Sequence, residues 1–173
     1  LMRDHDGQPT GLIGYLADIT ERLEVEEKLR LHARIVEDSD QGIIVTDAEE
    51  FIVSVNAAFS RITGYAREEA IGQTPDLLRS GIHDEDFRQQ VQAAMHGNGP
   101  WQGELWGRRK NGELYPQWAA ISAIRNLRGE VTHALSIFSD ISERKRNEER
   151  IHQLANYDTL TGLPNRTLLS RLV

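Results

Sequence analysis

The chain has 173 residues and a net charge of −7, from 27 acidic and 20 basic residues, and it contains no cysteine. The missing thiol excludes disulfides, thiolate metal sites and a cysteine nucleophile, and arginines mixed among glutamates argue against a nucleic-acid partner. No apolar run approaches the ~20 residues of a membrane-spanning helix, and no signal peptide is visible. We therefore expect a cytoplasmic location, with any inner-membrane anchor of the parent protein lying upstream.

A short passage occurs twice in the sequence. Residues 11–22 (GLIGYLADITER) return as residues 133–144 (HALSIFSDISER), and each copy predicts an aliphatic strand that stops at an Asp and leads into a charged helix. Self-similarity at a long spacing indicates a repeated module. We therefore expect residues 1–19 to be the tail of a preceding domain, and one complete domain to end at the second copy.

A linker helix is predicted over residues 20–38. Asp18 and Glu21 have the spacing of a capping box at its start. Its apolar residues recur at helical period and form a narrow stripe, made of Val25, Leu29, Ala33 and Val36. This stripe either packs on its own domain or pairs with a second copy of the chain.

The next segment predicts two strands and several short helices. Residues 42–46 and 51–55 are rich in β-branched residues and flank an acidic turn, and Asn56 fits the N-cap of a following helix. Gly64 and Gly72 separate small helical pieces. A longer helix follows over residues 84–95, where Phe87, Val91 and Met95 recur at helical period.

The last part of the domain predicts three strands. Residues 102–109 and 113–124 are joined by Asn111-Gly112, a strong hairpin signal, and residues 133–139 form the last strand. A second linker helix over residues 140–156 begins with Asp140 and Glu143 at capping-box spacing. The layout predicts an α+β fold with one five-stranded antiparallel sheet, helices on one face, and linker helices at both ends.

These motifs together resemble a PAS sensory domain with its C-terminal PAC motif, over residues 35–144. The segment before Thr20 is similar to the end of a preceding PAS domain. The stretches that carry the resemblance are VTD at 45–47, NAAF at 56–59, TGY at 63–65, SGIHD at 80–84, WQGE at 101–104, RKNGELYP at 109–116 and SDIS at 139–142.

A second resemblance is shorter. Residues 157–166 (YDTLTGLPNR) are similar to the opening of a GGDEF domain, which makes cyclic di-GMP, in the variant found where an EAL phosphodiesterase domain follows. The resemblance implies that residues 157–173 are the truncated start of such a domain, with its catalytic residues beyond Val173. We expect no enzyme activity in this chain, and a bacterial parent that is a diguanylate cyclase, a cyclic di-GMP phosphodiesterase, or both.

The resemblance to PAS domains implies a cofactor, a small metabolite or an empty core. The missing cysteine excludes light-oxygen-voltage flavin photochemistry. Haem-binding relatives place a His six residues after a His like His83, where this chain has Gln89, and flavin-binding redox sensors carry an Asn where it has Gly107. We therefore expect no haem and no flavin in the purified protein, while FAD remains the alternative; a small metabolite and an empty core both stay open.

Alternation along the strands sorts the candidate site residues into two faces. Flavin-type PAS domains imply a pocket formed by Trp101, Gly107, Gln117, Ala119, Ile121, Ser136 and Phe138. The opposite face carries Trp106, Trp118, Leu135 and Ile137, and we expect the apolar stripe of residues 25–36, from the same chain or a partner, to cover it.

We interpret the chain as a sensory and dimerisation module that relays a signal through a helical linker to a GGDEF domain, and we expect a homodimer. The alternatives are an FAD-binding redox sensor and a ligand-free structural spacer. Several acidic residues are adjacent in the sequence, and we expect them in turns and on helix surfaces. We therefore assign them no metal binding and no catalytic role.

Overall fold

The computed structural model of the chain describes residues 12–97, 99–157, 163 and 165, with side chains described from residue 21 onward. It divides into two compact units, residues 1–39 and residues 40–173. None of the described helices is long and apolar enough to cross a membrane.

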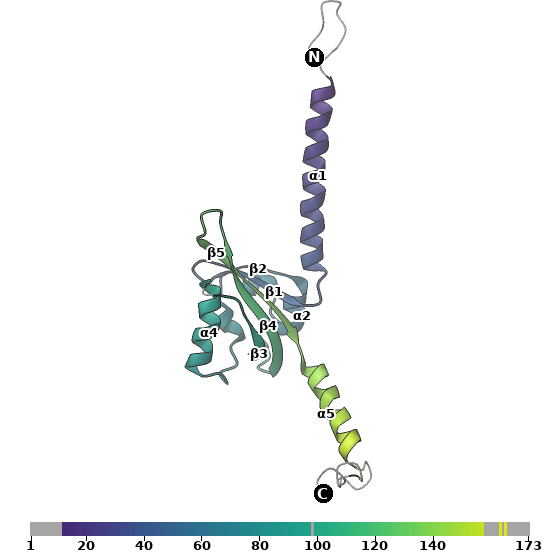
Figure 1. Cartoon of the computed structure of the whole chain (residues 1–173), viewed down its shortest axis with the longest axis vertical. Helices are drawn as coiled ribbons and strands as arrows, with labels where there is room; N and C mark the ends of the chain where they lie inside the picture. Colours follow the sequence, from purple (N-terminus) through teal and green to yellow (C-terminus); the bar gives the residue numbers. More distant parts are fainter. Residues whose placement is uncertain (1–11, 98, 158–162, 164, 166–173) are drawn as a thin grey trace, which may run out of the picture. The chain divides into compact units, whose positions relative to one another are not determined.

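The first unit contains one long helix, α1 (Leu12–Glu37) (Figure 1). The strand expected in the first copy of the repeated passage is therefore wrong, and Asp18 lies inside the helix rather than at its N-cap. An isolated strand leaves its backbone N–H and C=O groups without partners, whereas a helix satisfies them within the segment. The second copy forms a strand because neighbouring strands are present to pair with it.

The second unit is built on one antiparallel sheet (Figure 1). Its strand order is β2-β1-β5-β4-β3, so β2 and β3 form the edges and β5 lies at the centre. The α+β fold class and the five strands predicted from the sequence are confirmed. The strands are β1 (Gly42–Asp47), β2 (Ile52–Val55), β3 (Trp101–Arg108), β4 (Leu114–Arg125) and β5 (Val131–Asp140).

The helices between β2 and β3 begin where the sequence places capping residues. Asn56 caps α2 (Ala57–Thr63) by accepting a hydrogen bond from the Phe59 N–H at 3.1 Å, and Asp84 caps α4 (Glu85–Met95) by accepting from the Phe87 N–H at 2.9 Å. Between these two helices lie α3 (Arg67–Ala70) and the 3-10 helix η1 (Pro75–Leu78).

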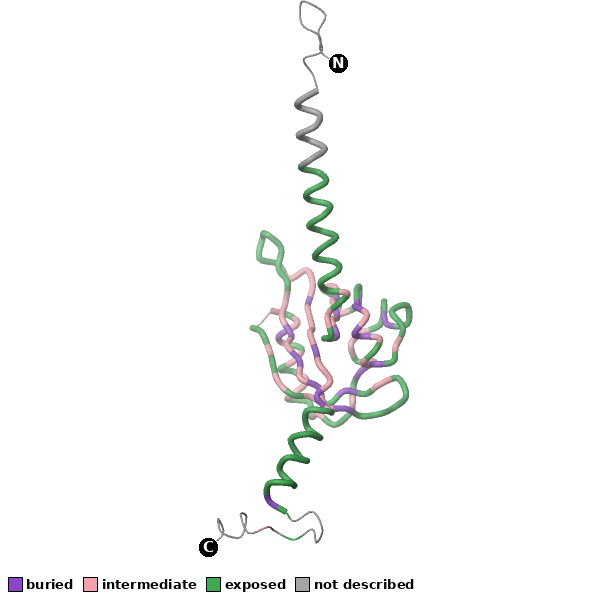
Figure 2. Tube along the Cα trace, turned by 90° about the vertical axis from the view of Figure 1, so that its right-hand side faces the viewer, coloured by how far each residue is buried: buried purple, intermediate pink, exposed green. Residues whose placement is uncertain are grey.

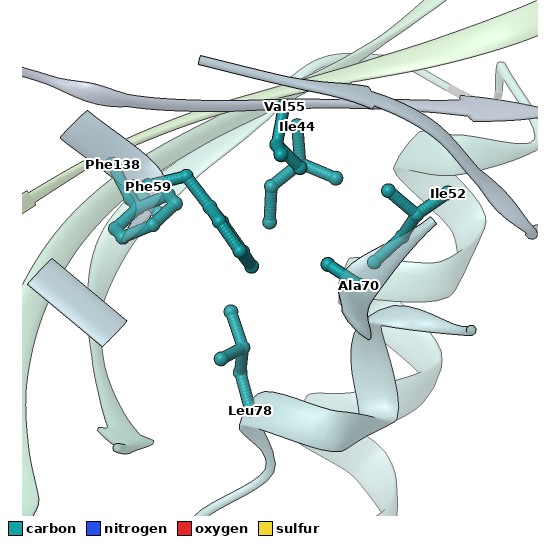
Figure 3. Packing of buried hydrophobic residues seen from close by; sticks show 8 residues of the cluster. Ile44, Ile52, Val55, Phe59, Ala70, Leu78 and Phe138 are labelled. Carbon is teal, nitrogen blue, oxygen red and sulfur yellow. The ribbon is translucent and has the colours of Figure 1, made fainter. Parts of the chain in front are cut away.

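The core lies between the inner face of the sheet and these helices (Figure 3). Phe59 from α2 meets Phe138 from β5 edge-to-face, with ring centroids 6.4 Å apart. Gly42 on β1 lies directly against the ring of Phe138, and any side chain at this position would overlap that ring. Ile44, Ile52, Val55, Ala70, Leu78 and Ala119 complete this buried cluster.

Helix α5 (Ser142–Asn156) follows β5 after one intervening residue, and most of its residues are exposed (Figure 2). The capping box expected from Asp140 and Glu143 is not formed, since Ile141 is the N-cap residue. Asp140 instead accepts a hydrogen bond from the Ser142 N–H and pairs with an arginine. Most of the segment that resembles a GGDEF domain lies outside the described residues.

Candidate functional site

A cavity of about 410 Å³ lies between the inner face of the sheet and the segment that contains η1 and α4. This volume lies in the range that holds small organic ligands. The lining surface is mainly apolar, although almost half of the lining residues are polar or charged. The apolar lining residues are Ile44, Pro75, Leu78, Phe87, Val91, Met95, Leu105, Trp106, Ala119, Ile121 and Phe138.

Five of the seven residues expected in a pocket line this cavity: Gln117, Ala119, Ile121, Ser136 and Phe138. Cross-strand pairing explains why they gather. Ala119 pairs with Phe138 and Ile121 pairs with Ser136, so these side chains emerge on the same face of the sheet.

The other two expected residues, Trp101 and Gly107, do not line the cavity. Trp101 packs edge-on against Phe87, with ring centroids 5.5 Å apart. Gly107 opens no space toward a ligand, because the ring of Tyr115 fills the space beside it; a Cβ on Gly107 would lie 2.9 Å from that ring. Gly107 and Tyr115 are cross-strand partners, so the missing side chain makes room for a tyrosine rather than for a ligand.

Gln117 is the most buried polar side chain of the cavity lining, with 6% of its surface exposed. Its Oε1 accepts a hydrogen bond from the hydroxyl of Tyr115 at 3.0 Å. Tyr115 is completely buried, and this burial raises the pKa of its phenol. The hydroxyl therefore stays protonated at neutral pH and acts as a donor to Gln117.

The ring of Tyr115 contacts Arg109, whose guanidinium carbon lies 4.1 Å from the ring centroid. The same guanidinium pairs with Asp140 at 2.5 Å, contacts Glu113 at 3.2 Å and donates to the backbone carbonyl of Ile62. Burial opposes the charge on Arg109, but its carboxylate partners prevail and raise its pKa. The β3–β4 hairpin is thereby tied to α2 and to the end of β5.

Asp140 connects this arginine to the start of α5. Its Oδ1 accepts a hydrogen bond from the Ser142 N–H at 2.8 Å, while its Oδ2 faces Arg109. Burial tends to raise the pKa of Asp140, but the hydrogen bonds from Ser142 and Arg109 outweigh it and lower that pKa. The carboxylate is therefore ionised and holds the first turn of α5 at neutral pH.

A second anchor of α5 lies on strand β3. Glu104 pairs with Arg144 at 3.1 Å and with Lys145 at 2.5 Å, both in the first turns of the helix. These groups are exposed to solvent, so this anchor is weak compared with the pair at Asp140.

His83 lies just before α4 and connects the lining of the cavity to the edge strand β3. The Nε2 of His83 accepts a hydrogen bond from the Trp106 N–H at 2.7 Å, and its ring stacks on Phe87 with centroids 4.1 Å apart. Accepting this bond requires the neutral imidazole. Burial lowers the pKa of His83, against an opposing effect of Asp84, and so favours that neutral form.

These residues do not fit a haem site. His83 is the one histidine among the described residues that line the cavity, and its Nε2 lone pair is engaged by Trp106. Gln89, which takes the place of the haem ligand in the family, is exposed on α4 and does not line the cavity. Among the described residues, no cluster of three or more His, Asp or Glu side chains could hold a metal ion.

The opposite face of the sheet carries the two other tryptophans. Trp106 pairs with Pro116 and Trp118 pairs with Ser139, so their side chains point away from Tyr115 and Gln117. Trp106 is 40% exposed and also borders the cavity, and Trp118, Leu135 and Ile137 are partly buried. The side chains of the apolar stripe on α1 are themselves exposed, and their role as a cover for this face stays a prediction.

Sequence reasoning missed Tyr115, Arg109 and the bond made by His83. The sequence did contain a signal for Tyr115, because it lies two residues before Gln117 in a strand and such residues share one face of the sheet. The pairing of Arg109 with Asp140 joins residues 31 positions apart and had no local signal.

Comparison with known proteins agrees with this architecture. Residues 31–141 match the PAS fold family. A nitrogen fixation regulatory protein of Klebsiella oxytoca is 34% identical over 126 residues, which cover 73% of this chain and 25% of that protein. The oxygen sensor protein DosP of Escherichia coli is 31% identical over 148 residues, which cover 83% of this chain and 18% of that protein. The chain thus spans a quarter or less of these curated relatives.

Solved structures show the same fold. The PAS domain of a protein from Colwellia psychrerythraea superposes with a TM-score of 0.62 at 28% identity, covering 67% of this chain and 98% of that one. An RNA-binding light-oxygen-voltage receptor superposes with a TM-score of 0.61 at 26% identity, covering 90% of this chain and 40% of that one. The chain therefore belongs to the PAS family.

Proposed function

We propose that this PAS domain is a sensory module in which the state of the cavity controls the start of α5, and that α5 carries the signal to a GGDEF output domain. One observation carries the proposal. A continuous series of contacts runs from the cavity lining to the first residue of α5, through Gln117, Tyr115, Arg109, Asp140 and Ser142.

The relay acts by shifting the population of two arrangements of the helix start. A ligand that moves the Gln117 amide changes the hydrogen bond to Tyr115, and with it the position of the ring beneath Arg109. Displacement of Arg109 weakens its pair with Asp140, which then holds the Ser142 N–H less firmly. The signal reaches α5 without any contact between the ligand and that helix.

The nature of the output is inferred from the sequence alone. Residues 157–166 are similar to the opening of a GGDEF domain, while the relatives include a histidine kinase, AtoS of Escherichia coli, which is 30% identical over 141 residues. PAS domains therefore serve different outputs, and the motif after α5 favours cyclic di-GMP in this protein. The chain by itself lacks the glycine-rich signature of the cyclase, so we expect it to leave GTP unchanged.

The module also acts as a homodimer in this proposal. The outer sheet face carries two indole rings beside Leu135 and Ile137, and apolar surface of this kind favours a partner. The cyclase family needs two active-site halves to join two GTP molecules. A dimer formed through the PAS domain would allow α5 to control how those halves meet.

The proposal is tested in the parent protein with two neighbouring variants of the hairpin. Arg109→Gln removes the partner of Asp140, whereas Lys110→Gln removes a salt bridge to Glu69 that does not involve α5. We expect Arg109→Gln to change the rate of cyclic di-GMP formation or breakdown several-fold, and Lys110→Gln to leave it nearly unchanged. Equal rates in both variants and in the wild type would contradict the proposal.

A further inference from the structure

The cavity has a chemical preference that follows from a single side chain. Its apolar surface includes Phe87, Val91 and Met95 on α4 and Ile121 and Phe138 on the sheet, while polar and charged residues form the rest of the lining. A polar ligand group placed against the apolar surface loses its hydration without compensation. The polar groups that do face the cavity therefore decide which ligands it accepts.

Gln117 is the polar side chain of the lining that is more than nine-tenths buried. Its amide oxygen is occupied by the hydroxyl of Tyr115. Its amide nitrogen, which carries two N–H donors, has no hydrogen-bond partner among the described residues. This nitrogen is not fully buried, so it remains accessible from the cavity, and an acceptor on a ligand can take the place of water there.

Tyr115 also fixes which end of the amide faces the cavity. The Tyr115 hydroxyl is buried, and Gln117 Oε1 is its one acceptor among the described residues. If the amide were turned around, its oxygen would face the cavity and the Tyr115 hydroxyl would have no acceptor for its proton. The nitrogen end of Gln117 therefore faces the ligand.

The charges around the cavity argue against an anionic ligand. The lining contains three acidic residues, Glu50, Asp76 and Glu85, and two arginines, of which Arg88 pairs with Glu85 through a terminal nitrogen while its buried Nε has no partner among the described residues. The imidazole of His83 is held neutral by the bond that it accepts from Trp106. A ligand carboxylate would thus meet a lining with no excess of positive charge, and a neutral acceptor avoids this cost.

We infer that the cavity binds a small, uncharged, largely apolar molecule that presents one hydrogen-bond acceptor, such as a ketone oxygen or a ring nitrogen, to Nε2 of Gln117. Gln117 is then the residue that determines ligand specificity. This inference deepens the proposed sensory function and rests on it for its biological meaning.

The test uses three probes of nearly equal shape. 2-Acetylnaphthalene carries a ketone oxygen, 2-isopropenylnaphthalene has a CH₂ group in its place, and 2-naphthoate carries a carboxylate. Each is titrated into the chain while its amide NMR signals are followed, including those of the Gln117 side chain. We expect the ketone to bind about five-fold or more tightly than the hydrocarbon, which is the gain that one hydrogen bond gives. The ketone should also bind more tightly than the carboxylate and should shift the NMR signals of the Gln117 side chain.

Two variants separate the role of Gln117 from general effects on the cavity. Gln117→Met keeps the length of the side chain but removes the donor, and it should abolish the advantage of the ketone over the hydrocarbon. Ile121→Val changes the same strand and the same cavity without touching the amide, and it should keep that advantage. If Gln117→Met does not fold, the shift of the Gln117 signals in the wild type decides the question.

The inference is overturned if none of the probes binds, if ketone and hydrocarbon bind the wild type equally, or if the ketone keeps its advantage in Gln117→Met. A separate result concerns the proposed function. If the ketone binds through Gln117 but the amide signals of α5 do not change, the specificity of the cavity stands and the relay to α5 fails.

Discussion

The ring and the hydroxyl group of Tyr115 serve different neighbours. The hydroxyl donates to Gln117 in the cavity wall, and the ring supports the guanidinium of Arg109. Because burial raises the pKa of the phenol, Tyr115 remains a neutral donor throughout the physiological range. One buried side chain thus touches both the proposed ligand site and the group that anchors α5.

His83 should make the stability of the domain depend on pH. Burial lowers its pKa below the ordinary value of 6.5, so the unfolded chain binds a proton more readily than the folded chain. The stabilisation by the neutral imidazole is complete above pH 6.5 and is lost as the pH falls through the folded pKa. We expect the free energy of unfolding, measured with urea, to decrease when the pH is lowered from 7.5 to 5.5. His83 should account for about 1 kcal/mol or less of this decrease.

His83→Gln provides the control for this prediction, because a glutamine oxygen can accept from the Trp106 N–H but does not titrate. Its pH profile should be flatter than that of the wild type over the same interval. If the free energy of unfolding changes with pH to the same extent in both proteins, His83 does not contribute to the pH dependence of stability.

At the residue level, strand alternation and the resemblance to flavin-type PAS domains assigned Gln117, Ala119, Ile121, Ser136 and Phe138 to one pocket. In the structure these five residues line the cavity, because cross-strand neighbours share a face of the sheet. The assignment of Gly107 to the pocket failed. The sequence shows that Gly107 has no side chain, but only the pairing of β3 with β4 shows that Tyr115 fills the space beside it.

At the level of elements, α5 is held mainly by Asp140. Arg109→Gln should cost about 1.5–3 kcal/mol of unfolding free energy at pH 7, since it removes a charge-assisted hydrogen bond of limited exposure. The pKa of Asp140 is lowered, so this contribution is present above the ordinary value of 3.8 and is lost as the pH falls through the folded pKa.

The difference between Arg109→Gln and the wild type should therefore shrink in acid, as chemical unfolding at several pH values would reveal. Lys110→Gln, which breaks a more exposed pair, should cost clearly less than Arg109→Gln at neutral pH. A cost for Lys110→Gln that equals the cost for Arg109→Gln would argue against a special role of Asp140.

The elements themselves were largely predictable. Caps at Asn56 and Asp84 and the turn at Asn111-Gly112 are local signals that the structure reproduces. The strand predicted near residues 11–17 failed because a strand depends on neighbours, and sequence alone does not show whether they are present. The capping box at Asp140 failed because α5 begins one residue later, with Ile141 as its N-cap, while the Asp140 carboxylate accepts from the Ser142 N–H and from Arg109.

For the whole molecule, the outer sheet face predicts a homodimer. Trp118→Arg should dissociate it, because a buried cation at the interface is costly. Leu127→Arg alters a fully exposed apolar residue in the β4–β5 turn and should leave the dimer intact. Sedimentation over a range of protein concentrations checks both variants, and a monomeric wild type would refute the prediction.

The central claim is that a change confined to the cavity alters the start of α5. Amide hydrogen exchange, followed by NMR, tests it most directly at Ser142, which bonds to Asp140, and at Lys145, which bonds to the carbonyl of Ile141. In Gln117→Leu the Tyr115 hydroxyl loses its acceptor, and we predict that exchange at both amides becomes three-fold faster or more, while Ile121→Val leaves them unchanged. Unchanged exchange in Gln117→Leu, or an equal acceleration in Ile121→Val, would contradict the account.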